Sequence, residues 1–258
     1  MTTDFLNNLY ANYKGNPIIS FEDLFSFVQK EFPGRAEKTI NWKINQLKSK
    51  GLLSHISRGI YSLQKKNEYF PEISPYLKRI YNKVKKDLPF IKFCVWDSRW
   101  FNEFMIHQIF RYYIVVEAEK GSTDSVFNVL TDFSKNVFLN PDKETFSRYV
   151  INYNEVIIVK PLISEAPLLD IEEVKVPAIE KLLIDCLIDV DLFAAQQVEL
   201  DNIYQSVYQK YLVNPNKIRR YARRRNQLTK FENKMESSKL NAVKQTDDIN
   251  VKYSAHNT

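Results

Sequence analysis

The first 65 residues combine three stretches of helical periodicity with a pair of short β-strand patterns. Residues 2–13, 20–32 and 36–50 each carry apolar side chains at the spacing of an amphipathic helix. Two short apolar segments follow and turn at Arg58-Gly59, which predicts a β-hairpin. Three helices followed by a hairpin are the order of a winged helix-turn-helix domain, and we predict this fold for residues 1–66.

The third helical stretch has two faces of different character. At 100° per residue, Ile40, Ile44 and Leu47 fall within about 60° of one another, so they should face the core. The opposite face is polar apart from one tryptophan and carries Arg35, Lys38, Thr39, Trp42, Asn45, Gln46 and Ser49. These side chains can donate hydrogen bonds to base edges and phosphates or accept them from bases.

In a helix-turn-helix domain the N-terminal part of such a helix enters the major groove of double-stranded DNA. We therefore expect DNA contacts from Arg35, Lys38, Thr39, Trp42, Asn45 and Gln46. Arg58 at the hairpin turn should reach a minor groove or a phosphate. Trp42 leaves two alternatives, packing on the sugar–phosphate backbone or partial burial against the hairpin. A merely solvated polar face is the alternative for the whole set.

Charge is segregated along the chain, although the net charge is only +6. Residues 33–66 carry eight basic residues and one acid, whereas residues 155–201 carry eleven acids and three lysines. Six of the nine residues in 217–225 are basic. The basic N-terminal segment suits a polyanion. Arg220, Arg223 and Arg224 are candidates for a second contact with DNA or with a partner protein, and the alternative is a solvated helix. The acidic segment is a solvated face or a surface for a basic partner.

The remainder of the chain predicts an α/β domain. Residues 67–89 predict a linker and a connecting, basic amphipathic helix, and residues 90–225 form the domain itself. Strand patterns there alternate with helical ones, which indicates a sheet with at least partly parallel pairing. The strands are expected at 91–96, 112–118, 136–140 and 155–162, with helices at 98–110, 122–133 and in three stretches after Pro177. Residues 226–258 are polar and predict a mobile tail. The fold class is thus mixed, α+β or α/β.

Little in the sequence points to catalysis. Five glycines and the absence of glycine-rich phosphate-binding motifs argue against a nucleotide site. Cys94 and Cys186 lie far apart in apolar runs, as buried thiols do, and neither a metal site nor a disulfide has the spacing it needs. We therefore expect no cofactor, no bound metal and no catalytic residue.

One set of acids leaves an enzyme alternative open. Asp97 ends one predicted strand, and Glu117 and Glu119 end the next, an arrangement that can bind Mg²⁺ for phosphodiester hydrolysis. A restriction-endonuclease-like core needs an acid-x-Lys triplet here, but Lys120 falls one position late. We expect either a catalytically silent core of this kind or an unrelated α/β layer, with an active nuclease as the third alternative.

Neither a membrane-spanning apolar run nor a signal peptide is evident, so a cytoplasmic protein is expected.

Two stretches resemble a known family. Residues 39–63, with Lys50-Gly51-Leu52 and Arg58-Gly59-Ile60-Tyr61, resemble the N-terminal module of AbiEi-type antitoxins from type IV toxin–antitoxin systems. Residues 176–185 are similar to that family's Pro-Glu-Lys-x-Leu-Leu-Asp helix start, although two residues separate Pro177 from Glu180 here. The resemblance implies a transcriptional repressor that binds its own promoter and counters a neighbouring nucleotidyltransferase-like toxin. The alternatives are a winged-helix-targeted, Mg-dependent nuclease and a plain one-component transcriptional regulator.

Overall fold

The computed structural model describes residues 3–13, 18–50, 52–63 and 67–237 of a mixed α+β chain. The chain divides into two compact units. The first unit comprises residues 1–68 together with 209–216, and the second comprises 69–208 together with the chain from 217 onward. No helix in the described part of the chain is long and apolar enough to cross a membrane.

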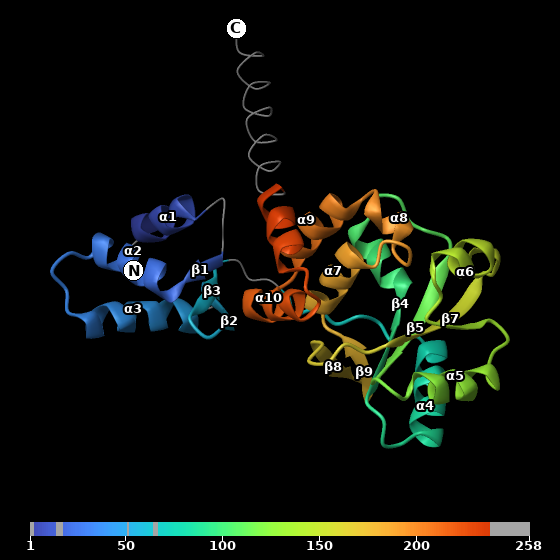
Figure 1. Ribbon diagram of the computed structural model, residues 1–258. Helices are drawn as coiled ribbons and strands as arrows, with labels where there is room; N and C mark the ends of the chain where they lie inside the picture. Colours follow the sequence, from blue (N-terminus) through green and yellow to red (C-terminus); the bar gives the residue numbers. More distant parts are fainter. Residues whose placement is uncertain (1–2, 14–17, 51, 64–66, 238–258) are drawn as a thin grey trace, which may run out of the picture. The chain divides into compact units, whose positions relative to one another are not determined.

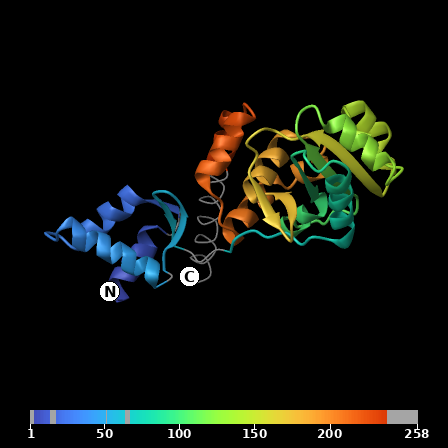
Figure 2. The same cartoon turned by 90° about the horizontal axis from the view of Figure 1, so that it is seen from below.

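The first unit has three helices and a three-stranded antiparallel sheet of order β1-β3-β2. Its elements are α1 (Thr3–Asn12), β1 (Ile18–Ser20), α2 (Phe21–Glu31), α3 (Glu37–Ser49), β2 (Ser54–Ser57) and β3 (Ile60–Ser62). In Figures 1 and 2 the β2–β3 hairpin (cyan) lies at one end of the helices (blue). The predicted helices and hairpin are confirmed, whereas strand β1 was not predicted.

Local sequence explains the boundaries of these elements. Ser20 caps α2, because its hydroxyl accepts the backbone N–H of Asp23 at 3.0 Å. Gly59 has φ +74°, a conformation that glycine adopts without strain, at the turn between β2 and β3. A core of buried side chains from all three helices and the sheet holds the unit together, with Leu9, Leu24 and Ile40 fully buried.

The second unit is built on a four-stranded sheet of order β4-β5-β7-β6. Strands β5, β7 and β6 are parallel and β4 is antiparallel to β5, so the prediction of partly parallel pairing is confirmed. The elements are α4 (Pro75–Asp87), β4 (Phe93–Asp97), η1 (Ser98–Phe104), β5 (Tyr112–Ala118), α5 (Thr123–Thr131), β6 (Val137–Leu139), α6 (Lys143–Arg148), η2 (Val150–Asn152), β7 (Glu155–Pro161), β8 (Leu168–Ile171), β9 (Val174–Pro177), α7 (Ile179–Ile188), α8 (Ala194–Gln197), α9 (Leu200–Lys210) and α10 (Pro215–Arg224).

Both faces of this sheet are covered. Helices α4 and α5 lie side by side on one face (Figure 1), where their apolar side chains pack with β9 against Val95, Val116 and Val159. On the other face Trp96 stacks on Phe193, which precedes α8, with ring centroids 5.6 Å apart. Because both faces are buried, the central strands are apolar without alternation, as their sequences show.

Three predictions for this unit are wrong. Residues 98–110 do not form one helix: a 3-10 helix ends at Phe104, and Glu199 accepts the backbone N–H groups of Ile106 and His107 in the following loop. The helix expected after Asp191 is divided into α8 and α9. Residues 228–237, expected in a mobile tail, are helical and bury Phe231. The rest of that predicted tail, 238–258, lies outside the described residues. The β8–β9 hairpin was not predicted.

Candidate DNA-binding face and buried charge network

The two faces of α3 differ as its sequence predicts. Ile40, Ile44 and Leu47 are at most 1% exposed and pack in the core of the first unit. Arg35, Lys38 and Asn45 are exposed, and Thr39 and Gln46 are partly exposed. The predicted contact residues from Lys38 to Gln46 therefore lie on the outer face of α3, whereas Arg35 precedes the helix, which begins at Glu37.

Trp42 is the unusual member of this face. Its side chain is 59% exposed, although tryptophan has one of the largest apolar surfaces of any residue. More than half of the Trp42 side chain is therefore open to solvent, so any burial against the hairpin is partial. An exposed tryptophan between basic and amide side chains can pack on a sugar or a base.

The basic residues of the first unit fall into two groups. Lys43 lies 3.6 Å from the centroid of the Phe32 ring, and Lys48 donates to the hydroxyl of Tyr61 at 3.0 Å. These two lysines thus support the unit's own packing. By contrast, Arg35, Lys38 and Arg58 make no ion pair with any residue that the structure describes. Their charges remain available to a polyanion.

Arg58 occupies the hairpin turn and is exposed. The turn is fixed to the helices because the carbonyl of Gly59 accepts the backbone N–H of Phe21 at 2.7 Å. His55 on β2 is exposed, with its ring 5.6 Å from that of Tyr61. Gly51, which belongs to the Lys-Gly-Leu motif, lies outside the described residues.

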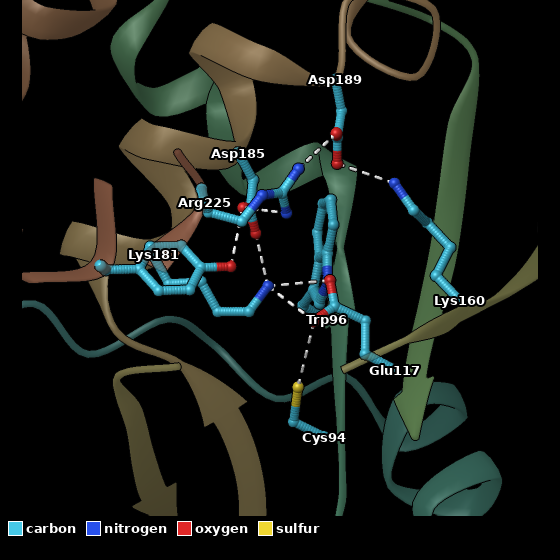
Figure 3. Close-up of polar contacts among 9 residues, drawn as sticks. Cys94, Trp96, Glu117, Lys160, Lys181, Asp185, Asp189 and Arg225 are labelled. Carbon is cyan, nitrogen blue, oxygen red and sulfur yellow. Dashed lines mark hydrogen bonds and ion pairs between the residues drawn. The ribbon is translucent and has the colours of Figure 1, made fainter. Parts of the chain in front are cut away.

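A second cluster, which we call the buried charge network, crosses the interior of the second unit (Figure 3). Its centre is Lys181 of α7, which is 1% exposed. The Lys181 ammonium lies 2.6 Å from a carboxylate oxygen of Glu117 on β5 and 2.5 Å from one of Asp185, a turn further along α7. The charged members of the network are Glu117, Lys160, Lys181, Asp185, Asp189 and Arg225.

Arg225 closes the network from the end of α10. Its guanidinium donates to Asp185 at 3.0 Å and to Asp189 at 2.7 Å. The Tyr221 hydroxyl also donates to Asp185, at 2.9 Å, and Lys160 of β7 donates to Asp189 at 2.7 Å. The network thus joins the sheet, α7 and α10 through charged side chains that form ion pairs and hydrogen bonds with one another.

The pKa shifts of Lys181 and Asp189 favour their charged forms, whereas burial raises the pKa of Asp185 although Lys181 and Arg225 oppose that effect. Burial by itself would lower the pKa of Lys181, but Asp185 and Glu117 outweigh it and raise that pKa well above its ordinary value. Burial would raise the pKa of Asp189, but Lys160 and Arg225 lower it overall. Three cations balance three carboxylates, so the interior carries no net charge from this cluster.

The acids considered for a nuclease are placed apart. Asp97 pairs with Ile114 and Glu117 pairs with Cys94 in the antiparallel β4–β5 register. Cys94, the partner of Glu117, lies three positions before Asp97, and side chains alternate along a strand, so the two carboxylates lie on opposite faces of the sheet. Asp97 is bound by Arg99 at 2.5 Å. The cluster of acids that the nuclease alternative requires is therefore not formed by Asp97 and Glu117.

The third acid of the nuclease alternative is hydrogen-bonded to the backbone, and both cysteines are buried. Glu119 accepts the backbone N–H of Lys92 at 3.0 Å. Cys94 and Cys186 are free, buried thiols, as expected, and burial raises the pKa of both. Among the described residues, no group of three or more histidines, cysteines and acids is placed to hold a metal ion.

The arginines predicted for a second contact lie on α10. Arg220, Arg223 and Arg224 are exposed, while Ile218 and Tyr221 form the buried side of the helix as predicted. Arg224 donates to the Ser164 hydroxyl through Nε at 2.7 Å. Arg225 of the same basic run is instead part of the buried charge network, a role that its position in a basic stretch did not indicate.

One sequence feature could have indicated the buried charge network, namely charged residues within apolar segments. Lys181 and Asp185 lie four positions apart in a helix whose only other charged residue is Glu180, and Glu117 interrupts an apolar strand. Charged residues at such positions are rarely buried without a partner. Their mutual pairing depends on residues up to 64 apart in sequence, which local patterns do not reveal.

The fold and these two clusters define a mixed α+β protein with an exposed polar helix face in one unit and a largely buried network of ion pairs in the other. The chain belongs to a family of unknown function, DUF6577, whose model matches residues 39–241. The matched region includes most of α3, the hairpin and the whole buried charge network. No curated protein matches the chain.

Proposed function

We propose that residues 1–66 form a winged helix-turn-helix domain that binds double-stranded DNA, with α3 as the recognition helix and the β2–β3 hairpin as the wing. The order of three helices and a hairpin supports this assignment. The observation that carries it is the outer face of α3, where Lys38, Trp42 and Asn45 are exposed while the opposite face is buried, with Arg35 exposed just before the helix. Phosphate contacts from Arg35, Lys38 and Arg58 would position the domain, and Asn45 and Gln46 would contact base edges.

We further propose that the protein is a transcriptional repressor acting on its own promoter, as the antitoxin of a type IV toxin–antitoxin system. The support is the resemblance of residues 39–63 and 176–185 to AbiEi-type antitoxins. The first stretch contains most of α3 and the hairpin. Within the second, Lys181 and Asp185 belong to the buried charge network, so this stretch contributes first to the stability of the second unit. A neighbouring gene for a nucleotidyltransferase-like toxin is required by the antitoxin proposal.

Binding of the full chain to DNA from its own promoter region tests the repressor proposal. We expect the promoter fragment to be bound more tightly than an unrelated duplex of equal length, with an affinity that falls as salt rises. Replacement of Arg58 by alanine should weaken binding modestly, because a wing contact is peripheral. It should also reduce the slope of log binding constant against log salt concentration (the salt slope) by about one. Fluorescence anisotropy over a range of salt concentrations measures the affinity and the salt slope. Equal affinity for promoter and unrelated DNA would contradict a sequence-specific repressor.

We expect no cleavage of DNA by this protein. Asp97 and Glu117 lie on opposite faces of the sheet, and Glu117 is already paired with Lys181. Supercoiled and linear DNA incubated with the full chain and Mg²⁺ or Mn²⁺ should therefore remain intact on a gel. Cleavage that disappears in the Glu117→Ala and Asp97→Ala variants would support the nuclease alternative instead.

A further inference from the structure

The second unit carries a basic surface around an exposed phenylalanine. This lysine–Phe90 surface consists of Lys85, Lys86, Phe90, Lys92 and Lys120. All five residues are exposed, and the Phe90 side chain is 96% exposed, more than any other large hydrophobic residue in the described part of the chain. The surface is remote in sequence from α3 and has no role in the proposed promoter contact.

Backbone hydrogen bonds hold its two segments together. The segment after α4 and the turn after β5 meet where the backbone N–H of Glu119 donates to the Lys92 carbonyl at 2.9 Å. The Lys92 N–H donates in return to the Glu119 carboxylate at 3.0 Å. Lys92 and Lys120 are therefore neighbours although they are far apart in sequence. Phe90 lies in the turn that separates Lys92 from α4.

The C-terminal end of α4 is joined to the same region. The Lys85 ammonium lies 5.8 Å from the centroid of the Tyr81 ring. Tyr81 in turn stacks on Phe93 at 4.7 Å, one residue after Lys92. The five side chains thus project from one continuous and well-anchored part of the unit.

The positive charge of this surface is only partly offset by acids of the same unit. Of the nearby acids, Asp87 pairs with Lys83 at 2.7 Å, and the Glu119 carboxylate, which accepts the Lys92 N–H, offsets one of the four lysine charges. Lys86, Lys92 and Lys120 form no ion pair with any residue that the structure describes. The lysines are therefore available to a ligand with several negative charges.

Phe90 restricts the class of that ligand. A phenylalanine ring offers an apolar face and no hydrogen bond, so it suits a flat partner such as a nucleobase. An anionic membrane surface also attracts lysines, but membrane-binding helices insert an apolar face. The apolar face of α4, with Leu77, Ile80 and Val84, is buried against the sheet and is not free to insert.

We propose that the lysine–Phe90 surface binds single-stranded nucleic acid. The lysines contact successive phosphates, and Phe90 stacks on an unpaired base. Lysines surrounding an aromatic side chain are the combination that single-strand-binding grooves use, with little preference for sequence. This inference does not depend on the promoter contact by α3.

Anisotropy of a fluorescein-labelled 20-nucleotide oligo-dT tests the proposal. The full chain carries Arg35→Ala and Lys38→Ala throughout, so that α3 contributes little to the signal. In this background Phe90→Ala should weaken oligo-dT binding about tenfold, the loss expected for one stacked base. The triple variant Lys86→Glu, Lys92→Glu, Lys120→Glu should abolish binding. All three lysines are exposed, and circular dichroism verifies that the fold is kept.

Matched control variants show whether the loss of binding is specific to this surface or follows from removing any exposed phenylalanine or any lysine charge. Phe110 is 90% exposed, and Lys143 of α6 is exposed; Phe110→Ala and Lys143→Glu should each leave oligo-dT binding within twofold. The proposal is overturned if the starting chain does not bind oligo-dT, or if Phe90→Ala binds as tightly as Phe110→Ala. Binding to vesicles of phosphatidylcholine and phosphatidylglycerol without binding to oligo-dT would overturn it in favour of a membrane contact.

Discussion

Replacement of Lys181 by methionine is expected to destabilise the second unit by about 3–5 kcal/mol, the cost of removing one partner from a buried ion pair. Methionine matches the length and volume of the lysine side chain but leaves Glu117 and Asp185 without their shared cation. Those carboxylates are 5% and 2% exposed, so water cannot replace the lost contacts. Urea unfolding, monitored by far-UV circular dichroism and tryptophan fluorescence, should show a large decrease in the urea concentration at which half of the protein is unfolded.

The control is a lysine whose ion pair is exposed. Lys175 pairs with Asp170 at 2.9 Å, but the two side chains are 48% and 67% exposed. Lys175→Met should therefore change the free energy of unfolding by less than about 1 kcal/mol. The double variant Lys181→Met, Glu117→Gln restores neutrality to the buried charge network and should be more stable than Lys181→Met alone. Equal stability of the Lys181→Met and Lys175→Met chains would contradict the structural role of the network.

Combined replacement of Arg35 and Lys38 by alanine is expected to reduce promoter affinity at least tenfold. A residue that contacts a base contributes roughly 1–3 kcal/mol, and each lost phosphate contact also lowers the salt slope by about one. Both side chains are exposed, so the fold should not suffer. Lys30→Ala is a matched control, because Lys30 is a basic residue of α2 that lines a hollow formed by α1 and α2. If the promoter affinity is unchanged in the double variant, the proposal that α3 contacts DNA is wrong.

The same variant also tests how the two activities of an antitoxin are divided. If the second unit counters a toxin, the Arg35→Ala, Lys38→Ala chain should still protect cells from the product of the neighbouring gene. Full-length variants are preferable to an isolated fragment 1–66, because the first unit includes residues 209–216. The Asn67 carbonyl accepts the N–H of Leu212, and Asn214 donates to the Ile56 carbonyl. Absence of a toxic neighbour would leave a DNA-binding regulator without an antitoxin role.

The candidate sites differ in how far the sequence could predict them. The outer face of α3 could be listed residue by residue, because a single helix of constant period determines which side chains share a face. The buried charge network could not, because its members come from β5, β7, α7 and α10. The lysine–Phe90 surface was missed for a similar reason, since Lys120 joins Lys92 only through β4–β5 pairing.

By itself, the sequence determined most elements of both units and the partly parallel sheet, because periodicity and capping residues such as Ser20 are local properties. It also determined which face of α3 is buried. Only the tertiary structure decided that the chain after Phe104 is not helical, because the Glu199 carboxylate, in the turn between α8 and α9, binds the backbone N–H groups of Ile106 and His107. Tertiary structure likewise placed Asp97 and Glu117 on opposite sides of a sheet and enclosed Lys181 between two acids. Strand register and the pairing of buried charges depend on contacts between distant segments, whose energies no local pattern encodes.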